Sequence, residues 1–185
     1  MSDFRVRVAV APDAPGYIRL MKSILRENPP VDTPYAADEF DPAPSAMAER
    51  IAEYPQTGNS LFLVALAGDG KSPVIGALTC RGGSLHSDRH VADLGIYVAR
   101  DWRNRGVGRA LMEQALAWAS VHPIIRRIQL EVLDGNDRAL HLYERSGFVR
   151  EGVRRSACLR SGTLVDMIIV AWLKYVEPSE FKEEN

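Results

Sequence analysis

The amino-acid sequence predicts a mixed α/β fold, in which helices pack on both faces of a central mixed sheet of about seven strands. Three observations support this fold class. Strand-like and helix-like hydrophobic patterns follow one another along the chain. The middle of the chain runs strand, helix, strand, helix, which is typical of helices packed on a sheet. Finally, the chain has 185 residues, of which 46% are hydrophobic, enough for one sizeable buried core.

The first part of the chain indicates one strand and two helices. Residues 4–10 alternate charged and apolar side chains, the period of a half-buried strand. Asp13 is placed to cap a helix that reaches about Glu27. Five prolines predict a loop over residues 28–44, and a second helix is expected over residues 45–54.

The remainder of the chain indicates six further strands and two further helices. The strands are expected at 61–67, 74–81, 91–99, 124–133, 148–159 and 163–173, and the helices at 104–121 and 136–146. The turn at 68–70 has hairpin chemistry, and the last two strands are joined at residues 161–162. No linker divides the chain, so we expect a single domain over residues 1–176 and an acidic, frayed tail over 177–185.

The composition excludes several classes of protein and site. No apolar run approaches the roughly 18 residues of a membrane-spanning helix, so we expect no membrane partner. The N-terminus has no signal-peptide pattern, and we expect a cytoplasmic protein. Cys80 and Cys158 are expected to be buried free thiols. The four histidines share no metal-ligand spacing, so we expect no metal.

Four arginines lie between residues 100 and 109 of a chain whose net charge is only −1. Such a local cluster fits a small polyanionic ligand better than nucleic acid, which calls for a broad basic face. We therefore expect no nucleic-acid partner. A solvated, arginine-rich surface is the alternative interpretation of the cluster.

A glycine-containing turn lies between the predicted strand 91–99 and the next helix, with the sequence Arg103-Asn104-Arg105-Gly106-Val107-Gly108. A helix start carries unpaired N–H groups and a positive dipole end, and glycines let a phosphate approach the backbone closely. The turn therefore favours a pyrophosphate site, although two close glycines can also form a simple tight turn. The P-loop pattern is missing, and Leu111 stands where the dinucleotide-binding fingerprint needs a third glycine.

Around this turn the sequence resembles the GCN5-related N-acetyltransferase (GNAT) superfamily. Arg103, Gly106 and Gly108 match its acetyl-CoA motif, Gln/Arg-x-x-Gly-x-Gly/Ala. Two further family motifs follow in order: an Asn after a strand, at Asn136, and an aromatic-containing helix that ends in Gly-Phe, at residues 139–148. The resemblance implies the GNAT fold with its strongly twisted sheet, acetyl-CoA as cosubstrate and no metal.

The resemblance covers about residues 4–173 and is strongest over 88–152. Segments 90–96 and 162–167 look like a bacterial subgroup near the ribosomal-protein N-terminal, amino-acid and polyamine acetyltransferases. The acceptor is then expected to be a primary amine of a small molecule, an amino acid or a polyamine-like compound. A protein N-terminus is an alternative acceptor, and a CoA-binding module without turnover is an alternative function. A homodimer is expected because dimers are common among the relatives.

The resemblance also implies roles for individual residues. Tyr143 would give a proton to the leaving thiolate, with a core aromatic as the alternative. Asp93 would act as the base, directly or through water, with Glu131 on the neighbouring strand as its rival and an ion-paired strand carboxylate as the alternative. A backbone N–H near Val98 would stabilise the oxyanion. Asn136 would bind the pantetheine arm, cap the helix, or do both.

The residues expected to contact acetyl-CoA are Ile96, Tyr97, Val98, Arg103, Asn104, Arg105, Gly106, Val107, Gly108, Arg109, Ala110, Asn136, Ala139 and Tyr143. Residues 28–58 are expected to shape the acceptor site, and their acidic side chains favour a cationic acceptor weakly.

Overall fold

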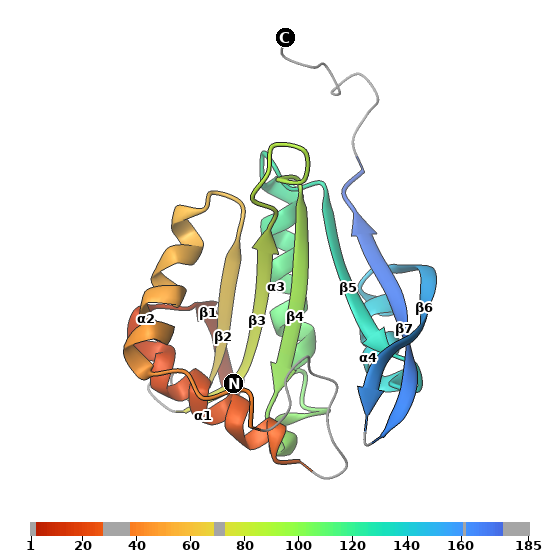
Figure 1. Cartoon of the computed structure of the whole chain (residues 1–185). Coiled ribbons are helices and arrows are strands. Elements are labelled where there is room, and N and C mark those ends of the chain that lie inside the picture. The colour runs from red at the N-terminus through yellow and green to blue at the C-terminus, as the bar shows by residue number, and fades with distance from the viewer. Residues whose placement is uncertain (1–2, 28–37, 69–72, 161, 176–185) are drawn as a thin grey trace.

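The computed structural model describes residues 3–27, 38–68, 73–160 and 162–175, which surround a seven-stranded sheet (Figure 1). The strands are β1 (Phe4–Val8), β2 (Leu61–Ala67), β3 (Val74–Gly82), β4 (Val91–Val98), β5 (Arg127–Leu133), β6 (Val149–Arg160) and β7 (Thr163–Leu173). Their order across the sheet is β1-β2-β3-β4-β5-β7-β6. The pair β4–β5 is parallel and all other neighbours are antiparallel, which confirms the predicted mixed sheet.

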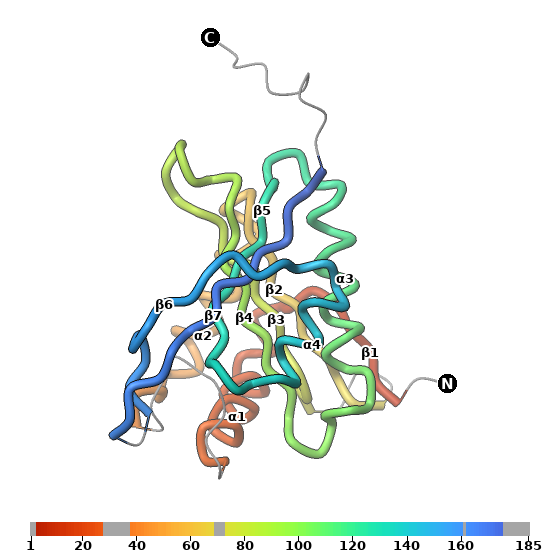
Figure 2. The backbone as a smooth tube through the Cα atoms, turned by 90° about the vertical axis from the view of Figure 1, so that its right-hand side faces the viewer, coloured from red at the N-terminus to blue at the C-terminus, as the bar shows by residue number. Residues whose placement is uncertain are grey.

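Helices cover both faces of this sheet, as predicted (Figures 1 and 2). They are α1 (Ala14–Leu25), α2 (Pro44–Glu53), α3 (Val107–Val121) and α4 (Asp137–Arg145), with short 3₁₀ turns at Ala11–Asp13, Tyr54–Gln56 and Arg100–Trp102. α1 and α2 pack on one face through buried side chains such as Met21 and Ile51. α3 and α4 pack on the other face through side chains such as Leu111 and Leu140.

Each face of the sheet has its own hydrophobic core because successive side chains of a strand point to opposite faces. In β3, Leu78 and Cys80 are fully buried in the core beneath α3, whereas Ala77 belongs to the core beneath α1 and α2. In β4, Ala92 and Leu94 belong to the α3 side. Asp93 and Gly95 therefore face the α1/α2 side, a placement that matters for the site.

Several predicted boundaries move, and two of them move by three residues for local reasons. The helix predicted to start at residue 104 starts at Val107, because Asn104 and Gly106 have φ values of 59° and 85°, outside the helical region. The strand predicted over 124–133 starts at Arg127. His122 Nδ1 accepts the backbone N–H groups of Ile124 and Ile125 at 3.2 and 3.3 Å, and this turn delays the strand.

Asp13 precedes α1, but its side chain makes no capping hydrogen bond to that helix. The carboxylate instead accepts the Val10 N–H at 2.8 Å and a bidentate pair of bonds from Arg7 at 2.6 and 2.7 Å. Burial by itself would raise the pKa of Asp13, but these hydrogen bonds and the charge of Arg7 hold it below the usual value. Asp13 thus fixes the β1–α1 connection.

Some predictions lie outside the described residues: most of the 28–44 loop, much of the 68–70 turn, Ser161 and the tail 177–185. The single domain over residues 1–176 stays a prediction. Cys80 is a buried free thiol, as expected, whereas Cys158 is free but partly exposed, so the prediction of its burial was wrong. None of the helices in the described ranges has the length and apolar composition of a membrane span.

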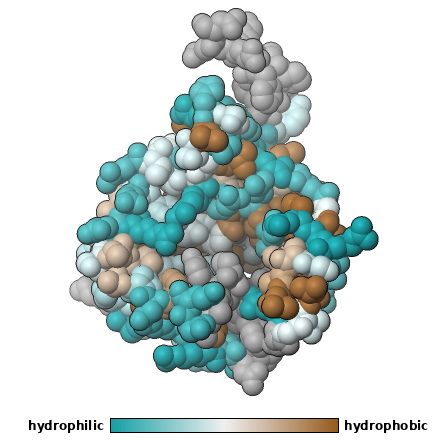
Figure 3. All heavy atoms as spheres, in the orientation of Figure 1, coloured by the Kyte–Doolittle hydropathy of each residue, from teal (hydrophilic) through white to brown (hydrophobic). Residues whose placement is uncertain are grey.

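The outer surface of β6 and β7 carries exposed apolar side chains, which include Val153, Leu159 and Leu164 at 58%, 66% and 62% exposure. Figure 3 shows hydrophobic atoms gathered on the side of the molecule where β6 and β7 lie. Most of the remaining visible surface is hydrophilic. This edge of the sheet therefore differs in character from the rest of that face.

Candidate active site

The parallel strands β4 and β5 pair only at one end. The pairs are Val91–Arg127, Ala92–Ile128 and Asp93–Gln129, and no further pair follows along β4. From Gln129 onward β5 continues to pair with β7, as far as Leu133 with Met167. The sheet is therefore split between β4 and β5 beyond Asp93.

A cavity of about 1030 Å³ occupies this split and reaches both faces of the sheet. On one side it is lined from α1, α2 and the floor of the sheet by residues that include Tyr17, Phe40, Met47, Arg50, Tyr54, Arg81 and Asp93. On the other side it is lined from the α3 and α4 region by residues that include Asn104, Gly106, Gly108, Arg109, Asn136, Ala139 and Tyr143. The glycine turn and the polar floor thus share one cavity through the sheet.

The edge of β4 presents backbone N–H groups to the split. Ala99 N–H donates to Ile75 of β3, and Val91 C=O accepts from Gly83 beyond β3. Because backbone direction alternates along a strand, odd-numbered residues of β4 bond towards β3 and even-numbered residues point towards β5. The N–H groups of Ile96 and Val98 therefore face the open split, where a ligand can add as a further strand.

The glycine turn ends at the start of α3. Gly106 is the N-cap in the left-handed region, at a φ of 85°, which an L side chain adopts only with strain. A Cβ on Gly108 would lie 3.5 Å from Leu142 and 3.8 Å from Val98, so this glycine lines the narrow space between α3, α4 and β4. Gly108 and the first turn of α3 consequently offer backbone N–H groups at the cavity wall.

The three arginines of the turn are engaged with protein partners. Arg103 donates to Val98 C=O at 3.0 Å and makes a bidentate pair with Glu27, at 2.6 and 2.5 Å. Arg105 stacks on a tryptophan ring and bonds an exposed carboxylate, and Arg109 pairs with the carboxylate one turn later. Arg103 therefore connects the segment after α1 to β4 in this structure. Arg105 and Arg109 make exposed, weak ion pairs.

The start of α4 places Asn136 and Tyr143 on the cavity. Asn136 is the N-cap, and its Oδ1 accepts the Ala139 N–H at 3.3 Å, as predicted for a helix cap. That bond does not use the Nδ2 group of the amide. Two turns later Tyr143 is 5% exposed, lines the cavity and packs at 5.7 Å from the Phe148 ring. Tyr143 is thus a core aromatic with one side on the cavity.

Arg138 is a cavity residue that the sequence analysis missed. It lies in the first turn of α4 and lines the cavity. Burial, and next the positive charge of Arg103, lower the pKa of Arg138, while Glu27 opposes the shift. The signal in the sequence was its place two residues after Asn136. The Glu27 carboxylate therefore lies near two guanidinium groups, those of Arg103 and Arg138, at this end of the site.

Polar side chains cross the floor of the cavity on the α1/α2 side. Arg81 of β3 is the register partner of Asp93, and Asp93 is the partner of Gln129. Gln129 Nε2 donates to Asp93 Oδ1 at 3.0 Å, so the predicted base has a neutral partner. Glu131, its rival, is held by Arg154 at 2.6 Å. The sequence analysis missed Arg81 and Gln129, which only the strand register brings beside Asp93.

Of the acidic residues expected near the acceptor site, the structure describes Asp38, Glu39 and Asp41, and none of these three lines the cavity. Asp41 pairs with Lys22 on an exposed surface, and that pairing lowers the pKa of Asp41. Residues 38–58 contribute Phe40, Met47, Arg50 and Tyr54 to the wall instead. Within the described residues, no three His, Cys, Asp or Glu side chains gather as metal ligands. The weak prediction of a cationic acceptor therefore loses its basis in the described part of this segment.

A split mixed sheet, with a glycine-bounded helix start on one side of the split and a polar floor on the other, defines a transferase of the acyltransferase class. Residues 20–148 match the model of the acetyltransferase (GNAT) family. The chain belongs to this family, and it is an N-acetyltransferase.

Two curated relatives carry specific activities in their names. The chain is 34% identical over 133 residues to the L-amino acid N-acetyltransferase AaaT of Escherichia coli, over 72% of this chain and 78% of the relative. It is 31% identical over 91 residues to the spermidine N(1)-acetyltransferase of Vibrio cholerae, over 48% of this chain and 53% of the relative.

Solved structures share the fold. A GNAT-family acetyltransferase of Streptococcus pneumoniae superposes with a TM-score of 0.85 at 25% identity, over 93% of this chain and 99% of that one. A phosphinothricin acetyltransferase of Sinorhizobium meliloti, solved with acetyl-CoA, gives 0.81 at 20% identity, over 98% and 96%. A ribosomal-protein-alanine N-acetyltransferase of Brucella melitensis gives 0.77 at 18% identity, over 91% and 99%.

Proposed function

We propose that the protein transfers the acetyl group of acetyl-CoA to a primary amine of a small molecule, an amino acid or a polyamine-like compound. The observation that carries this proposal is the cavity through the split sheet. Its α3/α4 side has the helix start and glycines that a pyrophosphate needs, and its α1/α2 side has a separate polar floor. The two reactants can therefore meet inside the sheet from opposite faces.

The residues present fit acetyl-CoA. Gly108 leaves the wall beside the first turn of α3 free of a side chain, and the backbone N–H groups of Asn104 to Arg109 would hold the pyrophosphate. The Ala110 N–H already donates to the Gly106 C=O at 2.9 Å, so it is not available to a phosphate. One of the N–H groups of Ile96 and Val98 would bond the pantetheine arm along the edge of β4, with Tyr97 between them, and the other would be left for the thioester oxygen. Asn136 Nδ2 would donate to the same arm, and Ala139 would pack against it. Arg105 and Arg109 would exchange their exposed partners for phosphate oxygens.

Acetyl-CoA supplies a thioester, whose carbonyl carbon the neutral amine attacks directly as the C–S bond breaks. The backbone N–H near Val98 would donate to the oxygen that becomes negative. Tyr143 would give its phenolic proton to the sulfur as it leaves. Asp93 would receive the proton lost by the amine, directly or through water, from its place on the floor. Burial around Tyr143 excludes water from the leaving group.

A thiol-release assay with acetyl-CoA and a panel of amines, amino acids and peptides tests the proposal. The Tyr143→Phe variant should lose at least 10-fold in kcat while acetyl-CoA binding by calorimetry stays within about twofold. Tyr175→Phe is the matched control, since Tyr175 is 83% exposed and outside the cavity lining. Acetyl-CoA binding without turnover of any amine would instead support a binding module.

Two further expectations stay predictions. A homodimer should appear in solution by light scattering, and the cytoplasm should contain the protein by fractionation. The exposed apolar side chains of β6 and β7 are of the kind that a partner covers.

A further inference from the structure

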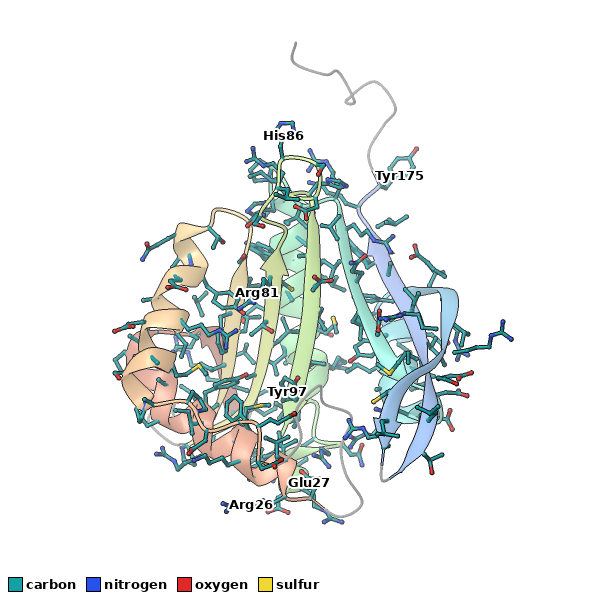
Figure 4. The ribbon with its side chains drawn as sticks, viewed as in Figure 1. Arg26, Glu27, Arg81, His86, Tyr97 and Tyr175 are labelled. Carbon is teal, nitrogen blue, oxygen red and sulfur yellow. The ribbon has the colours of Figure 1, made fainter. Side chains whose placement is uncertain are left out.

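A row of three polar side chains lies at one level of three neighbouring strands, and two of them, Arg81 and Asp93, line the floor of the cavity. Arg81 pairs in register with Asp93, and Asp93 with Gln129. Their immediate neighbours Cys80, Ala92 and Ile128 are fully buried on the α3 side, so the row faces α1 and α2. Figure 4 shows Arg81 over β3, with Tyr97 farther along towards α1.

Arg81 differs from the paired arginines of this protein. In the described ranges, its guanidinium has no hydrogen bond or ion pair, although it lines the cavity and lies beside Asp93. The arginines of the glycine turn, and also Arg127 of β5 and Arg154 of β6, each hold a carboxylate. Arg81 is exposed, and an arginine left unpaired on the wall of a ligand cavity is a ready site for an anion that the protein does not supply.

Arg50 adds a second guanidinium from the opposite wall. It lies on α2 between the buried Met47 and Ile51 on the helix surface, and it lines the same cavity. Among the residues that the structure places, Arg50 has no ion pair or side-chain hydrogen bond either. The acceptor side of the cavity therefore presents two guanidinium groups from two different elements.

Gly95 leaves room beside the row. A Cβ at this position would lie 3.3 Å from Thr79 Oγ1 and 3.7 Å from the Tyr97 ring, so the glycine keeps the floor open between Asp93 and Tyr97. That opening leads from the polar row towards the end of β4, where Val98 faces the split. An amine bound next to Asp93 thus has a path towards the proposed reaction centre.

The arrangement matches an α-amino acid, which carries a carboxylate and an amino group on one carbon. Arg81 and Asp93 stand on adjacent strands as the complementary cation and anion. A polyamine has only cationic groups and would meet two unpaired arginines, which costs like-charge repulsion. A peptide N-terminus has no carboxylate next to its amine. Aromatic and apolar side chains of the wall, such as Tyr17, Phe62 and Met47, suit an apolar amino-acid side chain.

We propose that Arg81, assisted by Arg50, binds the α-carboxylate of a free amino acid and thereby makes amino acids, rather than polyamines or peptides, the acceptors. This proposal rests on the proposed acetyl transfer and names its substrate class. Arg81 is the specificity-determining residue, and Asp93 takes the amino group beside it.

The test uses the full-length protein and three matched acceptors. The free amino acid with the highest kcat/KM in the thiol-release panel is compared with its amide and with the amine formed by removing its carboxylate. The wild type should lose about 10- to 100-fold in kcat/KM on either change, because a charged hydrogen-bonded partner is removed. Spermidine should be a poorer acceptor than the amino acid.

The variant Arg81→Gln should lose about 10- to 100-fold in kcat/KM with the amino acid but less than about threefold with its amide. Arg81→Lys should recover part of the loss, since it restores the charge without the planar fork. Arg5→Gln is the control, because Arg5 is an exposed arginine of the edge strand β1 outside the cavity lining. Acetyl-CoA affinity should stay unchanged in all of them.

Three results separate the ideas. If Arg81→Gln reduces turnover of the amino acid and its amide equally, Arg81 is structural and the inference is wrong. If a polyamine or peptide is acetylated and free amino acids are not, the inference is wrong while the acetyl transfer stands. If no amine is acetylated although the protein is folded by circular dichroism, the proposed function itself fails.

Discussion

Replacing Glu27 by Gln tests the tie between α1 and the glycine turn. Glu27 and Arg103 have side chains only 10% and 15% exposed, and two hydrogen bonds join them. The substitution keeps the size and removes the negative charge. It leaves the Arg103 guanidinium buried without a neutralising charge. It also removes the carboxylate that offsets the lowering of the Arg138 pKa by Arg103.

The expected cost follows from this burial. Removing one partner of a buried ion pair typically costs about 3–5 kcal/mol, because the other charge stays desolvated. Arg103 keeps its bond to Val98 C=O, and the amide of Gln can still accept one hydrogen bond. We therefore expect about 3 kcal/mol, the low end of that range. For a protein of this size that corresponds to a drop of about 6–12 °C in Tm.

Urea unfolding followed by circular dichroism, and a thermal scan, measure this loss. Asp41→Asn is the control, because it breaks an ion pair whose carboxylate is 80% exposed, and its unfolding curve should coincide with the wild type. The double variant Glu27→Met with Arg103→Met should recover part of the stability, since no charge is then left buried. A Glu27→Gln midpoint that coincides with the wild type would refute the reasoning.

Three further predictions concern stability and reactivity. Gly106→Ala should lower the free energy of unfolding by about 1–2 kcal/mol, because Gly106 has a φ of 85°. Calorimetry should also show weaker acetyl-CoA binding by this variant, and an unchanged affinity would contradict the role of the turn as a pyrophosphate site. Because Arg7 holds the pKa of Asp13 below its usual value, the ionised Asp13 stabilises the fold above about pH 4, and this contribution is lost as the pH falls. In Asp13→Asn the free energy of unfolding should therefore decrease less between neutral and acid pH. A decrease as steep as in the wild type would contradict this. Burial raises the pKa of the Cys80 thiol to about 12, so a thiol reagent should modify Cys158 alone in the folded protein and Cys80 only in urea.

The sequence predicted those parts of the fold that depend on local patterns. Alternation in β1, the apolar run of β2 and the apolar faces of the helices indicated the order of elements, which the structure confirms. Gly106 and Asn136 were identified from short local signatures, the glycine motif and a possible asparagine cap, and the structure makes them the N-caps of α3 and α4. The start of α3 moved by three residues because the φ of Asn104 depends on the turn as a whole rather than on its own propensity.

The candidate site was less accessible to sequence reasoning where it depends on long-range contacts. The partner of Arg103 is 76 residues away, just beyond the end of α1, and no pattern connects the two positions. Arg81 and Gln129 flank Asp93 only through strand register, which hydrophobic alternation does not specify between different strands. The family motif likewise describes the coenzyme side, so the acceptor side had to come from the structure.

The early end of the β4–β5 pairing also has a kinetic consequence. Because the cavity opens on both faces of the sheet, acetyl-CoA and the amine can be bound together, and CoA does not have to leave before the amine enters. Initial-rate plots at several fixed acceptor concentrations should therefore give intersecting lines, as a ternary complex requires. Free CoA should compete with acetyl-CoA and act as a mixed inhibitor against the amine. The early end of the hydrogen bonds between β4 and β5 thus determines the rate law of the enzyme as well as the shape of its site.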